Sequence, residues 1–150
     1  MGCKMFTSSN LFSEGYEVIK NFINSNITDP KGRYKKNWIH PSIPNITDQS
    51  FDGYPFITLA VDVSEKDKSF DRRTSNKIFR ILIGIYSDQA TEVDEIADEI
   101  VSKFKDETLT NSLNDFGVLE LSSSPFDVAV VGTKKIHQRI IGIRGVMRIW

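Results

Sequence analysis

Histidines, the cysteine and clustered carboxylates are the side chains with which this chain could do chemistry. His40 and His137 are the two histidines, and they lie far apart in the sequence. Neither has a cysteine or carboxylate beside it at a spacing typical of metal ligands, so we expect no zinc site and no nucleophile–histidine pair. Cys3 is the single cysteine, which rules out a disulfide within the chain.

The closest cluster of carboxylates lies in a segment whose apolar residues have helical spacing. We interpret these carboxylates as the solvated face of that helix. Acidic residues come early in the segment and Lys103 and Lys105 come late, as the helix dipole favours. The glycines form no phosphate-binding loop. We therefore expect no enzyme, no cofactor and no metal site. The clustered carboxylates are Glu92, Asp94, Glu95, Asp98 and Glu99.

Length and composition suit one globular domain. The chain has 150 residues, of which 39% are hydrophobic and 26% charged, with a net charge of −1. This composition excludes a disordered tail and a protein that binds nucleic acid over its whole surface. No apolar run approaches the ~20 residues that a membrane-spanning helix needs, so we expect no membrane partner.

The segment 77–87 is the element that must organise the fold, because it is apolar at alternate positions. Alternation places these residues on one face of a strand. The opposite face is largely apolar too, which predicts a strand that needs cover on both sides. The first face carries Phe79, Ile81, Ile83 and Ile85. The second face carries Ile78, Arg80, Leu82, Gly84 and Tyr86.

The remaining elements follow from apolar periodicity and predict an α+β fold. We expect an antiparallel or mixed sheet of about four strands in two hairpins, with two main helices on one face, in the order α-β-β-α-β-β. The other face then needs a second layer from this chain or from another copy. Ser87 or Asp88 is expected to cap the second helix. The predicted helices span 11–27 and 88–106, and the strands span 54–63, 77–87, 116–131 with a break at 122–125, and 136–150.

Two predicted loops could contact a partner. The irregular loop at 28–54 contains the basic residues Lys35 and Lys36 and the aromatic Trp38. Its aromatics could equally plug the edge of the core. The charged hairpin loop at 64–76 is either a solvated turn or a projecting tip that docks through Phe70 and its neighbours.

The last strand is basic, whereas the second helix is acidic. After Gly132 the chain has no acidic residue, and Gly142 and Gly145 are expected to mark bulges or close backbone approach. Opposite charges on one domain favour head-to-side contact between identical copies, although pairing within one chain would also explain them. We predict partner or subunit contacts at Phe70, Arg72, Arg73, Lys35, Lys36, Trp38, Arg144, Arg148 and Trp150.

The order of these elements resembles a known family. An amphipathic helix precedes a strand entered through Tyr54-Pro55-Phe56-Ile57, and a charged hairpin leads into the apolar strand 79–86. The acidic helix follows, and a strand pair ends at the last residue. Over most of residues 11–150 this layout resembles the tail terminator and tail-completion proteins of long-tailed bacteriophages. The likeness rests on element order and patterning.

The resemblance implies a structural protein of the virion, assembled in the host cytoplasm. Such proteins form a ring, usually a hexamer, at the head-proximal end of the tail tube. The ring ends tube polymerisation and provides the joint to the neck or connector protein. DNA passes through its lumen without sequence-specific binding. The alternatives are a head–tail joining or other neck protein, a small non-viral α+β binding module, or an enzyme whose site is assembled from distant residues.

Overall fold

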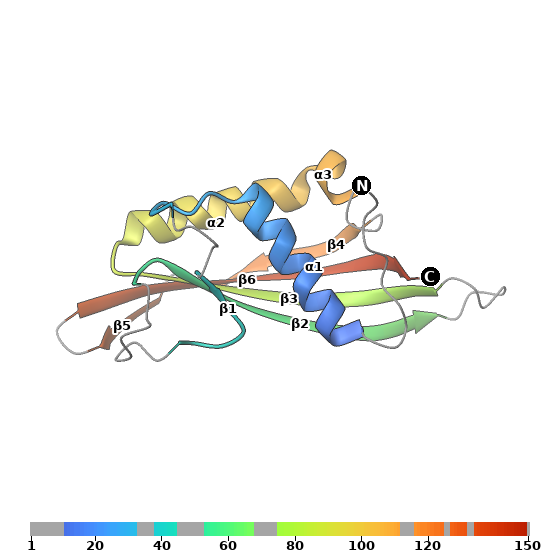
Figure 1. Cartoon of the computed structure of the whole chain (residues 1–150), viewed down its shortest axis with the longest axis horizontal. Coiled ribbons are helices and arrows are strands. Elements are labelled where there is room, and N and C mark those ends of the chain that lie inside the picture. Colours follow the sequence, from blue (N-terminus) through green and yellow to red (C-terminus); the bar gives the residue numbers. More distant parts are fainter. Residues whose placement is uncertain are drawn as a thin grey trace.

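The protein is built from one mixed sheet with helices over one of its faces (Figure 1). The computed structural model describes residues 11–32, 38–44, 53–67, 75–111, 116–124, 127–131 and 134–149. No helix in these ranges is long and apolar enough to cross a membrane. The predicted α+β class is confirmed.

The helices and strands follow the predicted order, with additions. The helices are α1 (Leu11–Asn26), α2 (Ala90–Lys105) and the short α3 (Glu107–Asn111). The strands are β1 (Ile39–His40), β2 (Phe56–Asp67), β3 (Ser75–Ser87), β4 (Gly117–Ser123), β5 (Asp127–Val131) and β6 (Lys134–Ile149).

The sheet has six strands in the order β1-β2-β3-β6-β4, and β5 also pairs with β6. β1 is parallel to β2, and all other pairs are antiparallel. The prediction of about four strands was therefore only partly correct. The predicted break at 122–125 separates β4 from β5 along one edge of β6, and β1 lies inside the predicted loop at 28–54.

The predicted charged loop at 64–76 was too long. β2 and β3 continue to pair through Ser64 with Ile78 and Glu65 with Lys77, and a bulge follows before Asp67 pairs with Asn76. Backbone hydrogen bonds join antiparallel strands whatever their side chains. A charged strand end has no apolar period, so the sequence pattern could not reveal it.

The alternating apolar face of β3 forms the centre of the core, as predicted. Phe79, Ile81, Ile83 and Ile85 are fully buried. Ile57 on β2 and Ile141 on β6 lie beside them in the same buried cluster, and both helices pack onto this face. Burying each such side chain contributes about 1.5–3 kcal/mol before conformational entropy is counted.

The second helix begins later than predicted. Its N-cap is Gln89, which makes no capping hydrogen bond through its side chain. The Ser87 hydroxyl accepts a hydrogen bond from the Gln89 N–H at 3.1 Å and donates one to Glu92 Oε1 at 2.7 Å. Ser87, the last residue of β3, therefore hydrogen-bonds both the N-cap residue and Glu92 in the first turn of α2. Neither Ser87 nor Asp88 is the N-cap itself.

Trp38 lies inside the core and is fully buried. Its carbonyl accepts a hydrogen bond from the Ile57 N–H at 2.7 Å, which ties the segment to the edge of β2. The prediction of Trp38 as a partner contact is therefore corrected, because a buried indole has no surface to offer. For Trp38 the alternative holds, since the aromatic plugs the edge of the core.

Candidate interaction surface

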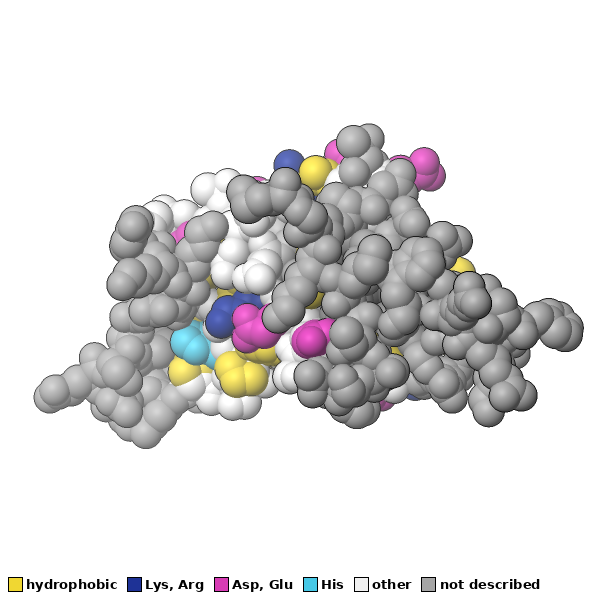
Figure 2. Space-filling model, turned by 45° about the vertical axis from the view of Figure 1, so that its right-hand side comes forward, with side chains coloured by type: hydrophobic (Ala, Val, Ile, Leu, Met, Phe, Trp, Pro, Cys, Tyr) yellow, Lys and Arg dark blue, Asp and Glu magenta, His cyan; other side chains and the backbone are white. Residues whose placement is uncertain are grey.

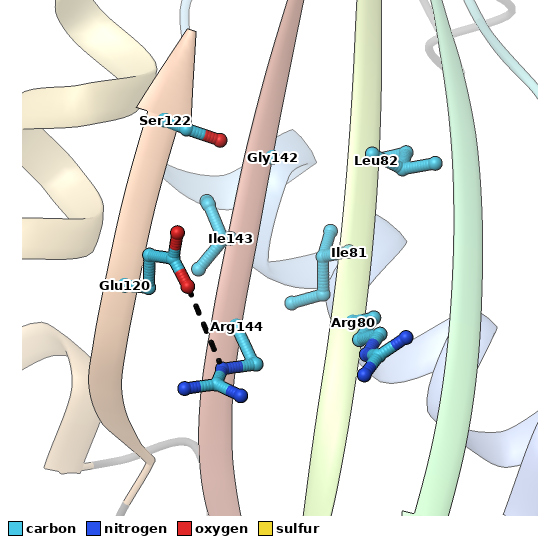
Figure 3. Close-up of a pocket in the computed structure, with 8 residues that line it drawn as sticks. All are labelled: Arg80, Ile81, Leu82, Glu120, Ser122, Gly142, Ile143 and Arg144. Atoms are coloured by element: carbon cyan, nitrogen blue, oxygen red, sulfur yellow. Dashed lines mark ion pairs between the residues drawn. The ribbon is translucent and has the colours of Figure 1, made fainter.

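The face of the sheet that the helices leave uncovered is the candidate site. We call it the open face. The space-filling view of Figure 2 shows another side of the molecule, where the described hydrophobic side chains form only small patches beside charged and histidine side chains. Figure 3 views the open face with the helices behind the strands, and the side chains of Arg80, Leu82 and Arg144 stand on it. Leu82, at the middle of the central strand β3, is 53% exposed.

A row of charges crosses the open face. The strand register places Asp62, Arg80, Arg144 and Glu120 side by side on β2, β3, β6 and β4. All four side chains are exposed. The row thus reads acid, base, base, acid, and the two arginines are direct neighbours across the β3–β6 pair. Like charges placed opposite each other across strands destabilise a sheet, so this pair is costly unless something neutralises it.

The row is only weakly paired within the chain. Arg144 Nε lies 3.8 Å from Glu120 Oε2, and these side chains are 44% and 64% exposed. Exposed ion pairs of this kind stabilise proteins by about 0–1 kcal/mol. Among the described residues no ion pair joins Arg80 to a carboxylate. Both guanidinium groups therefore retain hydrogen-bond donors that can face a partner.

A hollow of about 260 Å³ opens beside the arginines. Leu82 and Ser122 stand on either side of Gly142, and Arg80, Glu120 and Arg144 complete the rim (Figure 3). A Cβ atom at position 142 would lie 3.0 Å from the Ser122 hydroxyl oxygen and 3.6 Å from Leu82 Cδ2. The absent side chain of Gly142 therefore leaves room for the hollow between Leu82 and Ser122.

A second hollow, of about 250 Å³, lies on the other side of Leu82. Its walls come from Pro41 to Ile43 and from Ala60, Gly84 and Ile140. Ile43 is 61% exposed. Leu82 thus forms an apolar ridge between two shallow hollows, a shape that suits a complementary surface better than a small molecule.

One end of the open face is covered by the chain itself. The rings of Phe56 and Tyr86 stack with centroids 4.8 Å apart, and Tyr54 and Ile136 are buried beside them. Gln138 Nε2 donates a hydrogen bond to the Tyr86 hydroxyl at 3.1 Å. Burial raises the pKa of Tyr54, and the nearby Asp88 carboxylate adds to this. At Tyr86 the second layer expected over this face therefore comes from the chain itself, whereas Leu82 is left exposed.

Part of the basic character of β6 is neutralised on the helix side. Arg139 Nη2 lies 3.1 Å from Asp94 Oδ1 on α2, and Arg139 Nη1 donates to the Ser124 carbonyl at 3.3 Å. Pairing within the chain, the alternative explanation for the two charged poles, thus accounts for Arg139. It does not account for Arg80 on β3 or for the exposed carboxylates of Glu95 and Asp98 on α2.

A separate apolar surface lies on β5, which pairs with the first residues of β6, at the end of that strand away from the C-terminus (Figure 1). Val128 is 45% exposed and Val130 is 69% exposed. Their cross-strand partners are His137 and Lys135, so this surface has an apolar centre and a basic neighbour.

The structure places only part of the predicted contact set. Arg144 lies on the open face and Trp38 lies in the core. Arg148 belongs to β6, opposite Asn76, and its side chain is not described. Arg80 and Glu120 were missed, although the charged Arg80 on the second face of the central strand was a visible signal. Lys35, Lys36, Phe70, Arg72, Arg73 and Trp150 lie outside the described residues.

The comparisons add no family to these observations. No family model matches the chain, and no curated protein matches it. In the ranges that the structure describes, no group of three or more histidine, cysteine or acidic side chains could hold a metal ion.

Proposed function

We propose that the chain is a structural protein of a phage virion. In this proposal it forms a ring, usually a hexamer, at the head-proximal end of the tail tube. The ring ends tube polymerisation and provides the joint to the neck or connector protein. The observation that carries the proposal is the open face, where Leu82 is 53% exposed at the centre of the sheet.

Assembly is the use that best suits this surface. A single exposed leucine on a protein surface is ordinary. Leu82, however, stands beside exposed Ala60 and near exposed Ile43, on the stretch of β3 whose other face is fully buried from Phe79 to Ile85. Burying Leu82 in an interface would contribute up to about 1.5–3 kcal/mol, before the cost of association. Repeated in every copy, this contribution favours association between copies, as a ring requires.

A ring protein of this kind needs surfaces for more than one partner. The exposed valines of β5 lie away from the open face and suit the tube or the neck protein. The predicted docking tip around Phe70, Arg72 and Arg73 remains a proposal for the same role. DNA would pass through the lumen without sequence-specific contacts, which agrees with the net charge of −1.

A tube-length assay tests the proposed function directly. Purified chain is added to tail tube protein while the tube protein polymerises, and tube lengths are measured by negative-stain electron microscopy. We expect shorter tubes with extra density at one end, because a bound ring removes the growing end. Unchanged tube lengths, together with no binding to tube ends, would overturn the proposal.

The mass of the protein in solution, which reports its oligomeric state, distinguishes the tail ring from the alternative functions. The solution mass is measured with and without tube protein. A chain that remains monomeric and ignores tube subunits would instead be a small non-viral binding module. A chain that assembles but binds only a neck or connector protein would be a head–tail joining protein.

A further inference from the structure

We propose that the acidic outer surface of α2 in one copy docks on the Arg80–Arg144 pair of the next copy. This proposal rests on the proposed ring and names the contact that would build it. The docking group consists of Glu95 and Asp98, which we call the acidic pair. Its receptor is the arginine pair with the Leu82 ridge beside it.

The acidic pair consists of the two carboxylates in the acidic cluster of α2 for which no contact within the described chain is seen. Asp94 is bound by Arg139, and Glu99 Oε1 accepts a hydrogen bond from the Thr28 N–H at 3.0 Å. Glu92 accepts the Ser87 hydroxyl. Glu95 and Asp98 are exposed, and in the described part of the chain neither takes part in an ion pair. These two carboxylates therefore face solvent in the isolated chain.

The spacing of the two pairs matches. Residues three apart on a helix have Cβ atoms about 5–6 Å apart, which applies to Glu95 and Asp98. Residues directly opposite on antiparallel strands have Cβ atoms about 4.5–5.5 Å apart, which applies to Arg80 and Arg144. Each carboxylate can thus meet one guanidinium group, and arginine binds carboxylates through two parallel hydrogen bonds. Docking would also relieve the repulsion between the arginines.

The contact must join different copies. The arginine pair lies on the open face, whereas α2 lies over the opposite face of the sheet (Figure 1). One chain therefore cannot bring its own acidic pair onto its own arginines. A contact between two different surfaces is heterologous, and it produces a ring when the rotation between copies closes.

Two other occupants fit the charge row less well. An aligned face-to-face dimer would stack arginine on arginine, because the row from Asp62 to Glu120 reads the same from both ends. A nucleic acid would meet Asp62 and Glu120 on either side of the arginines, and these carboxylates repel phosphate. An acidic pair no wider than the arginine pair avoids both problems.

Charge reversal tests the contact. Arg80→Glu with Arg144→Glu, and separately Glu95→Lys with Asp98→Lys, should each weaken assembly at least tenfold in sedimentation equilibrium. All four substitutions in one chain should restore it, because the attraction is then re-formed with opposite sign. Lys134→Glu with Lys135→Glu changes the net charge as the arginine variant does and should leave assembly intact.

The alternative outcomes are distinct. Assembly that survives both reversals, or a quadruple variant that stays dissociated while its unfolding midpoint is normal, would overturn the contact. So would a wild-type chain that stays monomeric both alone and on tube ends. Loss of DNA binding in the arginine variant with assembly unchanged would assign the arginines to nucleic acid and overturn it as well.

Disulfide trapping tests the direction of the contact without altering its charges. In a Cys3→Ser background, Ser122→Cys is combined with Thr91→Cys or with Ser102→Cys, which flank the acidic pair on α2. We expect one of these combinations to give linked species larger than dimers. Dimers from Ser122→Cys alone would indicate face-to-face packing and overturn the proposal.

These tests also separate this contact from the proposed function. Linked multimers with no effect on tube length would keep the contact and remove the tail role. Tube capping that persists in both reversal variants would keep the tail role and remove the contact.

Discussion

At the scale of single residues, two glycines of β6 leave space for neighbouring groups, one on each face of the sheet. Gly142 has no side chain to fill the hollow on the open face. Gly145 lies on the core face opposite Phe79, and the Phe116 ring occupies the space where its Cβ would stand. The predicted close approach at this position is therefore confirmed, and the neighbour involved is an aromatic ring of the core.

Gly145→Ala should destabilise the protein by about 1–3 kcal/mol, the usual range for overpacking a core. The new methyl group would overlap the Phe116 ring and lie 2.8 Å from the Gly117 carbonyl oxygen. Urea unfolding measures the change. Gly117→Ala is the matched control, because a Cβ there meets no atom within 4 Å. Equal stability of the two variants would show that Phe116 can move aside at little cost.

At the scale of elements, the start of α2 depends on a residue of the preceding strand. Ser87 is fully buried, and its hydroxyl serves both the Gln89 N–H and the Glu92 carboxylate. Ser87→Ala should therefore cost about 0.5–2 kcal/mol, as the loss of a capping side chain does. Thermal or urea unfolding measures it, with exposed Ser102→Ala on the same helix as control. A loss no larger than that of the control would contradict the role given to Ser87.

The elements that sequence could predict are those with a clear apolar period. α1 and α2 were predicted to within a few residues, and both faces of β3 were assigned correctly. β1 has two residues, too few for any period, and it exists because Trp38 anchors it against β2. The charged ends of β2 and β3 were missed because backbone pairing leaves no trace in side-chain pattern.

At the scale of the whole molecule, the sheet has one face buried under the helices and one face on which Leu82, Arg80 and Arg144 are exposed. The sequence predicted this asymmetry because both expected helices fall on one face of the sheet. It could not predict that Tyr54 and Phe56 cover one end of that face, since this depends on how the chain enters β2. Nor could it align Arg80 with Arg144, because register between distant strands follows from the complete sheet.

Leu82→Ser is the substitution that tests this asymmetry, because Leu82 is the apolar ridge of the open face. Removing the isobutyl group should weaken assembly about tenfold, or ~1.4 kcal/mol, somewhat less than the transfer energy of a fully buried leucine. Monomer stability should hardly change, since the side chain is half exposed. Sedimentation equilibrium measures association, and urea unfolding measures stability. Leu119→Ser is the matched control, because Leu119 is 50% exposed on β4 and lines neither hollow of the open face. Equal effects of the two substitutions would mean that exposed leucines act non-specifically and that the open face has no special part in assembly.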